Sequence, residues 1–374
     1  MKILIVPDKF KHTLTAFQVA DTIQIALQNI YPYAEIIKLP AADGGEGTAE
    51  ISAPYFNAKK INLSVKNPIF QPVNASYYFS EENKTALIDM SAASGLQLLK
   101  AKDRNPLHTS TYGTGEIICD AFDKGARTIY LALGGSATND AGCGAAEAVG
   151  YKFYDKNNKQ IKNIRGKNLT EITKIEGSEV KINFNKLQIT ALHDVSNPLY
   201  GKNGAAYVYA GQKGANSNEI KLLDKGLRNF AEIARKQFNI TFDNCSGCGA
   251  AGGFGAGSKM FFNAELKSGA ETVLQFSGFN KLIKNTNLII TGEGKFDKQS
   301  FDGKLTGTII KKADENKIPV TVICGTNESE DSFTYKNLKI LPLYKKFPGN
   351  EIAKKEAVQK IKEITVKSNL NFVL

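Results

Sequence analysis

The chain opens with KILIV (Lys2–Val6), AFQVADTIQIALQN (Ala16–Asn29) and EIIKL (Glu35–Leu39), and these three pieces decide the fold class. The first and third are apolar runs of strand length. The middle piece repeats its apolar residues with the spacing of one helix face, at Val19, Ile23, Ala26 and Leu27. A strand, a helix and a second strand in this order form a β-α-β unit, so the sequence predicts an α/β fold built on parallel strands.

The end of the chain repeats this rhythm. Leu288–Thr291 and Val320–Cys324 are strands of the buried type, and a helix near Gly307–Asn316 separates them. A chain of 374 residues is too long for one hydrophobic core, which rarely grows past ~250–300 residues. We therefore expect two domains, a parallel α/β domain from residues 1–65 and 286–374 and an inserted mixed α/β domain from residues 66–285.

Between the two ends the pattern changes twice. Ile61–Val65, Val73–Phe79 and Thr85–Met90 alternate apolar and polar residues between turn residues, which predicts an antiparallel meander. From Tyr112 the α/β rhythm returns. The expected elements are Glu116–Lys124 (helix), Thr128–Leu133 (strand), Ala141–Val149 (helix), Ile189–Leu192 (strand) and Ile220–Asn239 (helix).

The formal charge of +11 raises the question of nucleic-acid binding. The cations are almost all lysines spread along the chain, and the arginines are scattered at Arg104, Arg127, Arg165, Arg228 and Arg235. Arginine is the usual residue for bidentate base and phosphate contacts, so we expect no nucleic-acid partner. A basic surface would instead attract small anions. No apolar run has the length of a membrane span, and the N-terminus lacks a signal-peptide pattern, so we expect a cytoplasmic protein without membrane contact.

The cysteines predict neither a disulfide framework nor a metal centre. Five of them are scattered along the chain, and Cys245 and Cys248 form a lone CxxC without a second pair nearby. His12, His108 and His193 lie far apart in sequence, so a zinc site lacks ligands. We interpret the CxxC as two small residues that enter a glycine-rich loop.

Loops that combine glycine, acid, hydroxyl and lysine residues recur after predicted strands. They are Pro7–Lys11, Ala42–Thr48, Thr111–Glu116, Gly134–Asp140, His193–Leu199, Gly247–Gly253 and Thr291–Asp297. Gly134–Asp140 lies between a strand and a helix, where backbone N–H groups and a helix N-terminus can hold a phosphate. The alternative is that Gly134-Gly135 only makes a tight turn with close packing. No Walker A or GxSxG motif is present, and the GxGxxG at Gly247–Gly252 has no clear strand before it, so helix packing is its favoured role.

Phosphoryl transfer needs cations on the phosphates, carboxylates for a divalent ion, and a group that orients or deprotonates the attacking hydroxyl. The loops supply cations at Lys11, Lys295 and Lys304, and acids at Asp8, Asp43, Glu46, Asp140, Asp194, Glu293 and Asp297. Each acid alone could be a turn former or a helix cap. Their joint recurrence at strand ends favours phosphoryl transfer.

Long motifs follow one another in this order: PDKFKxxLTA (Pro7–Ala16), ADGGEGT (Ala42–Thr48), AASGL (Ala92–Leu96), NPLxTSTYGTGE (Asn105–Glu116), GGSATNDAGCG (Gly134–Gly144), DVSNPLYGKNGAA (Asp194–Ala206), GQKGA (Gly211–Ala215), GAAGGFGAG (Gly249–Gly257) and TGEGKFDKQSFDGK (Thr291–Lys304). With these motifs the chain resembles the bacterial glycerate kinase family from end to end. His12 stands where that family usually has Gly, and His193 where it often has Cys.

The resemblance implies a kinase that uses ATP and Mg²⁺ to phosphorylate D-glycerate, in a branch similar to the enzymes that form 2-phosphoglycerate. Formation of 3-phosphoglycerate, or another small hydroxy acid as substrate, stays open, as does a non-catalytic nucleotide-binding protein of the same fold. The implied fold has a Rossmann-like domain built from both chain ends and an inserted domain, with the active site in the cleft between them. The expected partners are ATP and D-glycerate, and the oligomeric state stays open.

Placed on the matching motifs, the implied chemistry predicts roles for particular residues. The catalytic pair is Asp194, which acts on the substrate hydroxyl, and Lys11, which stabilises charge. The expected ATP-phosphate residues are Gly134, Gly135, Ser136, Thr138 and Lys304. The expected substrate residues are Asp8, Asn197, Thr111 and Gly113, and the expected magnesium carboxylates are Asp43 and Asp297.

Overall fold

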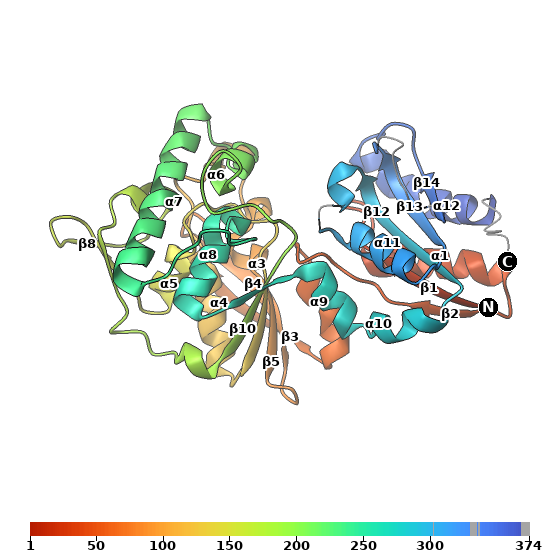
Figure 1. The fold of residues 1–374 in the computed structure, drawn as a ribbon, viewed down its shortest axis with the longest axis horizontal. Coiled ribbons are helices and arrows are strands. Elements are labelled where there is room, and N and C mark those ends of the chain that lie inside the picture. Colours follow the sequence, from red (N-terminus) through yellow and green to blue (C-terminus); the bar gives the residue numbers. More distant parts are fainter. Residues whose placement is uncertain (302, 330–334, 336, 368–374) are drawn as a thin grey trace. The chain divides into compact units, whose positions relative to one another are not determined.

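The computed structural model describes residues 1–301, 303–329, 335 and 337–367, and it divides into two compact units. The terminal unit comprises Met1–Asp43 and Ala270–Leu374, and the central unit comprises Gly44–Gly269. Each unit has helices packed on a sheet with parallel strands (Figure 1). The predicted α/β fold class is confirmed.

The terminal unit is built on a five-stranded parallel sheet in the order β14-β13-β12-β1-β2. Its strands are β1 (Lys2–Pro7), β2 (Glu35–Lys38), β12 (Leu288–Phe296), β13 (Val320–Asn327) and β14 (Leu338–Pro342). β1 lies beside β12, from Ile3 opposite Leu288 to Pro7 opposite Gly292. The two ends of the chain therefore share one sheet.

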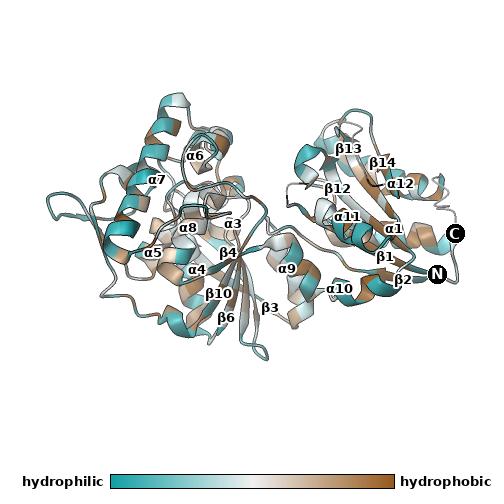
Figure 2. Cartoon of the chain, in the orientation of Figure 1, coloured by the Kyte–Doolittle hydropathy of each residue, from teal (hydrophilic) through white to brown (hydrophobic). Residues whose placement is uncertain are grey.

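Helices cover both faces of this sheet. The helices of this unit are α1 (Ala16–Ile30), α9 (Gly269–Phe276), α10 (Phe279–Leu282), α11 (Leu305–Glu315) and α12 (Asn350–Lys367), with 3-10 turns η7 (Ile283–Asn285) and η8 (Lys298–Phe301). α1 and α12 pack together on one face, where Ile3, Ile5 and Ile290 share a core cluster with Ile23 and Ile361. α11 lies on the other face (Figure 1). Burial on both faces explains why β1 is apolar from Ile3 to Val6 and β12 begins with three apolar residues, Leu288 to Ile290 (Figure 2).

The strand order of the terminal unit reverses between β1 and β12. From β1 the chain moves to β2 on one side, and from β12 it moves to β13 and β14 on the other. Ligands of open α/β sheets bind at such a reversal, beside the carboxyl ends of the strands. Asp8 follows β1, and Glu293 follows the last β12 residue paired with β1, so both lie at this edge.

The central unit is built on a six-stranded sheet in the order β11-β10-β6-β5-β4-β3. Its strands are β3 (Lys59–Lys66), β4 (Pro72–Ser80), β5 (Thr85–Asp89), β6 (Thr128–Ala132), β10 (Gln188–His193) and β11 (Glu265–Ser268). The first three form the predicted antiparallel meander, and the other pairings, including β5 with β6, are parallel. A small sheet, β8-β7-β9, contains β7 (Lys152–Tyr154), β8 (Gln160–Ile161) and β9 (Lys174–Glu176).

The division into units differs from the predicted residue ranges at 44–65 and 270–285. Residues from Gly44 belong with the central unit because β3 pairs with β4 along its whole length. α9 and α10 belong with the terminal unit, where Glu271 pairs with Lys312 of α11 at 2.8 Å and Leu282 O accepts from Lys2 Nζ at 3.4 Å. These long-range contacts are invisible in local sequence patterns.

The helices of the central unit surround a large aromatic and aliphatic core. They are α2 (Thr48–Ser52), α3 (Ser91–Ser94), α4 (Tyr112–Asp123), α5 (Cys143–Ala148), α6 (Ala205–Tyr209), α7 (Ser217–Phe238) and α8 (Ala250–Phe262). The 3-10 turns are η1 (Ala53–Phe56), η2 (Leu96–Leu98), η3 (Ala101–Asp103), η4 (Gly166–Thr170), η5 (Phe184–Lys186) and η6 (Gly211–Lys213). The long helix α7 begins at a capping box, in which Asn216 and Glu219 bond each other's backbone.

The GxGxxG stretch lies at the start of α8 and serves close packing, as predicted. No strand separates it from α7 in this fully described stretch of the chain. A Cβ on Gly252 would lie 2.1 Å from Thr138 O, and a Cβ on Gly257 would lie 2.0 Å from Ala141 O. α8 therefore approaches the loop after β6 at a distance that only glycine permits.

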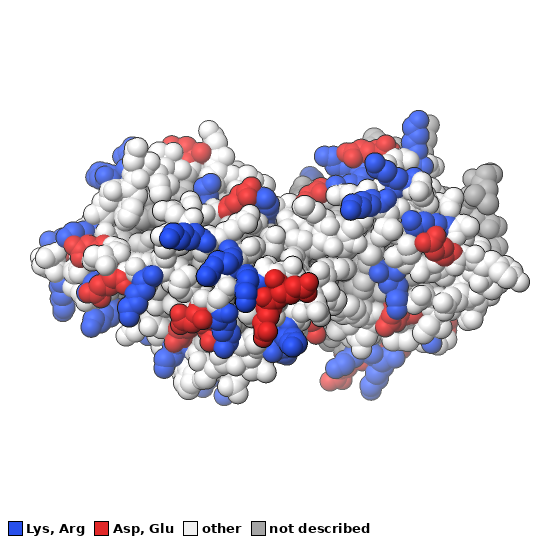
Figure 3. All heavy atoms as spheres, turned by 90° about the horizontal axis from the view of Figure 1, so that it is seen from below, with Lys and Arg blue, Asp and Glu red and all other residues white. Residues whose placement is uncertain are grey.

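Charged side chains are mixed in sign. In the view of Figure 3, the Lys and Arg side chains of each unit are interspersed with Asp and Glu side chains. Within the described residues, no helix combines the length and the apolar character that a membrane crossing needs.

Candidate functional site

The glycine loop, Gly134–Asp140, follows β6 in the central unit. A Cβ on Gly134 would lie 2.4 Å from Gly45 Cα, and Gly134 N donates to Gly44 O at 3.2 Å. Gly135 has a φ of +77° and is exposed. The first glycine therefore allows two loops to touch, which is the packing role considered for it. The second is exposed, although its carbonyl oxygen accepts from Leu96 N at 2.9 Å.

Asp140 holds the base of the glycine loop. Its carboxylate accepts hydrogen bonds from Thr111 N and Thr111 Oγ1 at 2.8 Å each, and from Gly142 N and Gly144 N at 3.2 Å. Burial raises the pKa of Asp140, and these donors act in the opposite direction. An acid with this many internal donors supports the loop rather than a ligand.

Two predicted substrate residues lie beneath the loop rather than at its surface. Thr111 is fully buried, and its hydroxyl, besides bonding Asp140, accepts from Ala145 N at 2.9 Å. Gly113 is buried in the first turn of α4, where a Cβ would lie 1.9 Å from Lys66 O. Both positions act on the site through packing in this structure.

Lys213, which received no role from the sequence, contacts the glycine loop. It lies in η6 and is 4% exposed, and its Nζ donates to Ser136 Oγ and to Thr138 O at 2.8 Å each. Burial lowers the pKa of Lys213 to about 7, and the charge of Asp140 acts the other way. The only sequence signal for this residue was its place in the GQKGA motif.

Two polar atoms of the loop have no hydrogen-bond partner within the described part of the chain. Thr138 Oγ1 and Asn139 Nδ2 are buried without a hydrogen bond. An unpartnered buried polar group costs about 1–3 kcal/mol, and such groups are rare in native proteins. Thr138, a predicted phosphate residue, has a fully buried side chain.

The loop after β10 carries the predicted catalytic acid. β10 pairs with β6, and Leu133 N donates to Leu192 O, so this loop is a neighbour of the glycine loop. Asp194 is half-buried, and its charge adds to burial in raising the pKa of Tyr209 to about 12. Asn197, a predicted substrate residue, is tied to the same loop, since Oδ1 accepts from Tyr209 Oη at 2.5 Å and Nδ2 donates to Asn203 O at 2.8 Å.

The prediction that the cysteines form no disulfide framework is wrong for the CxxC. Cys245 and Cys248 form a disulfide, because the tight turn between them brings their Cα atoms to 5.5 Å. The turn packs on the loop after β10: a Cβ on Gly247 would lie 2.5 Å from His193 Nε2, and Gly249 N donates to Asn197 O at 2.9 Å. Cys119, Cys143 and Cys324 are free thiols.

The terminal unit holds a second set, the acid cluster of Asp8, Asp43 and Glu293. Burial raises the pKa of Asp8 well above its usual range, and the charges of Asp43 and Glu293 add to this effect. Burial raises the pKa of Glu293 to about 7. The hydroxyls of Ser300 and Thr306 and the charge of Lys304 lower this pKa, and the charge of Asp43 raises it. Glu293 Oε1 is buried and has no hydrogen-bond partner among the residues that the structure describes. Its joint position with Asp8 at the strand-order reversal makes this the most ligand-like edge of the terminal unit.

The remaining predicted residues also lie in the terminal unit. Lys11 is exposed on the loop after β1, and Lys304, near Glu293, is the N-cap residue of α11. Asp297 lies 3.3 Å from Lys295 Nζ, which also pairs with Glu328 at 2.7 Å. Asp302, in the last motif, lies outside the described residues. The predicted ATP-phosphate set is thus divided, with Lys304 in one unit and the glycine loop in the other.

His12 is one of the two departures from the family pattern, and its backbone conformation is that of a glycine. Its φ of +65° lies in the left-handed region that glycine adopts without strain. The position next to Lys11 therefore has the backbone shape of a glycine site, although a histidine occupies it.

The carboxylates could supply only part of the ligands of a magnesium ion. Within the described residues, no three His, Cys, Asp or Glu side chains gather closely enough to hold a metal ion. Magnesium in phosphoryl-transfer sites is commonly held by one or two carboxylates, completed by phosphate oxygens and water. A carboxylate such as Asp43, whose charge acts on Glu293, fits that arrangement.

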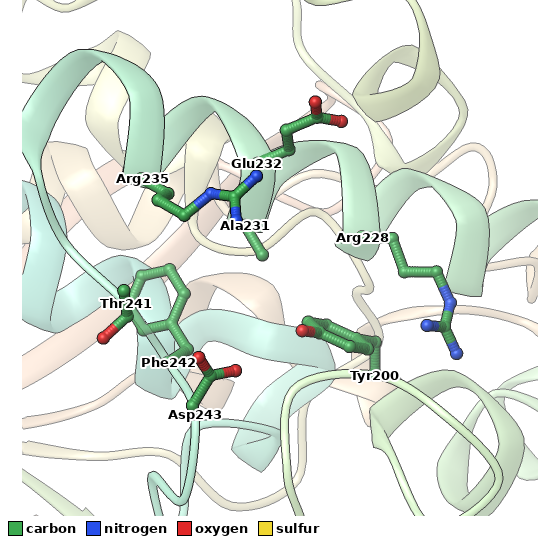
Figure 4. A pocket seen from close by; sticks show the side chains of 8 residues that line it. All are labelled: Tyr200, Arg228, Ala231, Glu232, Arg235, Thr241, Phe242 and Asp243. Atoms are coloured by element: carbon green, nitrogen blue, oxygen red, sulfur yellow. The ribbon is translucent and has the colours of Figure 1, made fainter.

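A separate hollow of about 240 Å³ lies beside α7 in the central unit (Figure 4). It is lined by Tyr200, Arg228, Ala231, Glu232, Arg235, Thr241, Phe242 and Asp243. Arg235 and Asp243 point into it, whereas the Arg228 guanidinium stacks on Tyr200 at 4.7 Å and bonds Asp224 at 2.8 Å. Small-molecule pockets are usually roughly 300–1,000 Å³. No predicted site residue lines this smaller hollow, so we assign it no part in the function.

Known proteins resemble this chain over most of its length. The model of the glycerate kinase family matches residues 3–368. A glycerate kinase of Halalkalibacterium halodurans is 41% identical over 87% of this chain and 85% of its own, and a glycerate 2-kinase of Escherichia coli is 40% identical with the same coverage. The crystal structure of a protein described as glycerate kinase 2 of Salmonella typhimurium superposes with a TM-score of 0.85, at 34% identity over 98% of this chain and 97% of its own. The chain belongs to the glycerate kinase family.

Proposed function

We propose that this protein is a glycerate kinase, which transfers the γ-phosphoryl group of ATP to a hydroxyl group of D-glycerate. The family match over residues 3–368 carries the proposal, and a kinase of this family implies ATP as the phosphoryl donor. The glycine loop supports it, because exposed backbone at Gly135 lies next to a buried lysine. Anions are commonly held by backbone N–H groups together with positive charge.

The proposed roles follow the two sets of residues. Gly134, Gly135, Ser136 and Thr138 form the phosphate loop, with Lys11 and Lys304 as further cations. Asp194 accepts the proton of the attacking hydroxyl, and Asp8 and Asn197, with Thr111 and Gly113 beneath the loop, shape the substrate side. Asp43 and Asp297 are the proposed carboxylates for Mg²⁺, which would neutralise charge on the phosphates when bound.

We propose 2-phosphoglycerate as the product, since the relative from Escherichia coli is described as a glycerate 2-kinase. The test is magnesium-dependent ADP release in the presence and absence of D-glycerate, with the product passed to enolase. We expect ADP release only with D-glycerate and an enolase signal without added mutase. Equal ADP release without a hydroxy acid would overturn the kinase proposal, and a strict need for mutase would reverse the regiochemistry.

Asp194→Asn tests the base. The change keeps the shape and removes the negative charge, so turnover should fall by roughly 10²–10⁴-fold while nucleotide affinity barely changes. Steady-state kinetics and nucleotide titration measure the two quantities. If Asp194 only shapes the turn, Asn will substitute well and turnover will stay near that of the wild type. In that case Asp43 becomes the next candidate for the base.

A further inference from the structure

Lys213 is buried in a way that stability does not explain. Its ammonium has two hydrogen-bond acceptors, Ser136 Oγ and Thr138 O, and Asp140 is the acid whose charge acts on it. Burying a charged amine has a desolvation penalty of several kcal/mol, and an apolar residue of similar volume is often neutral or stabilising in its place. A buried lysine with these two uncharged acceptors is therefore a candidate for function.

The chemistry of the contact assigns a direction to the Ser136 hydroxyl. A lysine ammonium has three donors and no acceptor, so Ser136 Oγ accepts in this hydrogen bond. The proton of Ser136 is then not engaged with Lys213 and is available to another acceptor. Ser136 is 7% exposed and follows the exposed Gly135, so it lies at the edge of the part of the loop that solvent reaches.

We propose that Lys213 is a positioning residue, whose ammonium holds Ser136 Oγ as an acceptor and thereby presents the Ser136 hydroxyl as a donor to a phosphate oxygen of the nucleotide. The inference rests on the proposed function, which places phosphate at the glycine loop. Lys213 also anchors Thr138 O, so one cation fixes the loop at two points.

The protonation state of Lys213 then controls the donor. A neutral amine has a lone pair and can accept from Ser136, which would turn the hydroxyl proton inward. Since the pKa of Lys213 is about 7, with Asp140 as the charged group that raises it against burial, the neutral form is populated just above neutral pH. A bound phosphate favours the ammonium, so nucleotide affinity should fall as pH rises above 7, and binding at pH 8 should take up a proton.

The experiment measures ADP and ATP dissociation constants by calorimetry at pH 6, 7 and 8, in buffers of different ionisation enthalpy. The proteins are the wild type, Lys213→Met, Lys213→Arg, Ser136→Ala and the double variant Lys213→Met with Ser136→Ala. Lys202→Met removes the same charge from an exposed position of the same unit and serves as the control. Thermal melts at pH 6 report folding.

We expect Lys213→Met and Ser136→Ala each to weaken binding by about ten- to hundredfold, the loss of one hydrogen bond to a charged group. The double variant should bind as Ser136→Ala does, within about twofold, because both changes remove the same donor. Lys213→Met should melt at or above the wild-type temperature, lose the proton uptake and lose the pH dependence of affinity. Lys213→Arg should keep part of the affinity, and Lys202→Met should bind as the wild type does.

Wild-type affinity in Lys213→Met, or losses that multiply in the double variant, would overturn the positioning role while the proposed function stands. A wild type that binds nucleotide without phosphorylating D-glycerate would overturn the proposed substrate alone. The nucleotide affinities of the variants would still test the role of Lys213. A wild type that binds no nucleotide would overturn both. If Lys213→Met does not fold, the titrations of the wild type test the proposal. A nucleotide affinity that does not change with pH, together with no proton uptake on binding, would then contradict it.

Discussion

The glycine loop of the central unit and the acid cluster of the terminal unit lie at equivalent places, beside the carboxyl ends of parallel strands, yet they bury opposite charges. Lys213 lies beneath the first, and the second contains Asp8, Asp43 and Glu293. Sheet topology therefore decides where a ligand edge lies, while the side chains decide its chemistry. One edge is suited to anions, and the other to protons or cations.

Opposite buried charges give opposite dependences of stability on pH. Where the native state binds fewer protons than the unfolded state, stability rises with pH, and where it binds more, stability falls. The pKa of Lys213 is lowered, so this residue affects stability between about pH 7 and pH 10.5. Over that range its contribution to stability rises with pH. The pKa of Glu293 is raised, so this residue affects stability between pH 4.5 and about pH 7. Over that range its contribution to stability falls as pH rises.

The largest effect is expected for Lys213. Between pH 7 and 10.5 its contribution to the free energy of unfolding should rise by about 5 kcal/mol, since each pKa unit corresponds to about 1.4 kcal/mol. The measurement is the difference in denaturant unfolding between the wild type and Lys213→Met across this range, in which other titrations cancel. The variant should be the more stable protein at pH 7, with the gap closing as pH rises. A constant gap would mean that Lys213 stays charged through other contacts.

Glu293→Gln should remove the opposite slope in the terminal unit. The wild type should lose about 3 kcal/mol relative to this variant as pH rises from 4.5 to 7, because the unfolded chain ionises Glu293 more easily than the native state does. Unfolding is followed without nucleotide or divalent cation. Hydrogen exchange of β1 and β12 assigns the change to this unit. Parallel pH profiles of the two proteins would contradict a raised pKa.

Asp297→Asn should have the smallest effect on stability. It compares an acid outside the acid cluster with the acids inside it. Lys295, its partner, has a half-exposed side chain and a second acid in Glu328, so the change in unfolding free energy should stay below about 1 kcal/mol. If Asp297 serves Mg²⁺, the magnesium concentration for half-maximal activity should rise. An unchanged magnesium requirement would remove Asp297 from the proposed ligands and leave Asp43.

Part of the candidate site could be predicted because its signals are local. Gly134 and Gly135 predict a turn that needs glycine. In the structure Gly134 is needed for a close contact with Gly45, and Gly135 for its positive φ. Thr111 and Gly113 belong to the same family motifs, yet both are buried beneath the loop. A motif identifies residues that a site needs, but it does not distinguish those that face a ligand from those that support the loop.

The sequence by itself determined the α/β class, the meander, the packing role of the glycine-rich helix and the family. Helical and strand periodicity, turn residues and motifs act over a few positions, so they can be read without a fold. Only the tertiary structure decided that β1 pairs with β12, that the units divide at Gly44 and Ala270, and that Cys245 bonds Cys248. It also brought Lys213 to Ser136 across 77 positions of the chain. Such contacts arise from packing of distant segments, and the burial that shifts the pKa of Lys213 and Glu293 exists only once those segments meet.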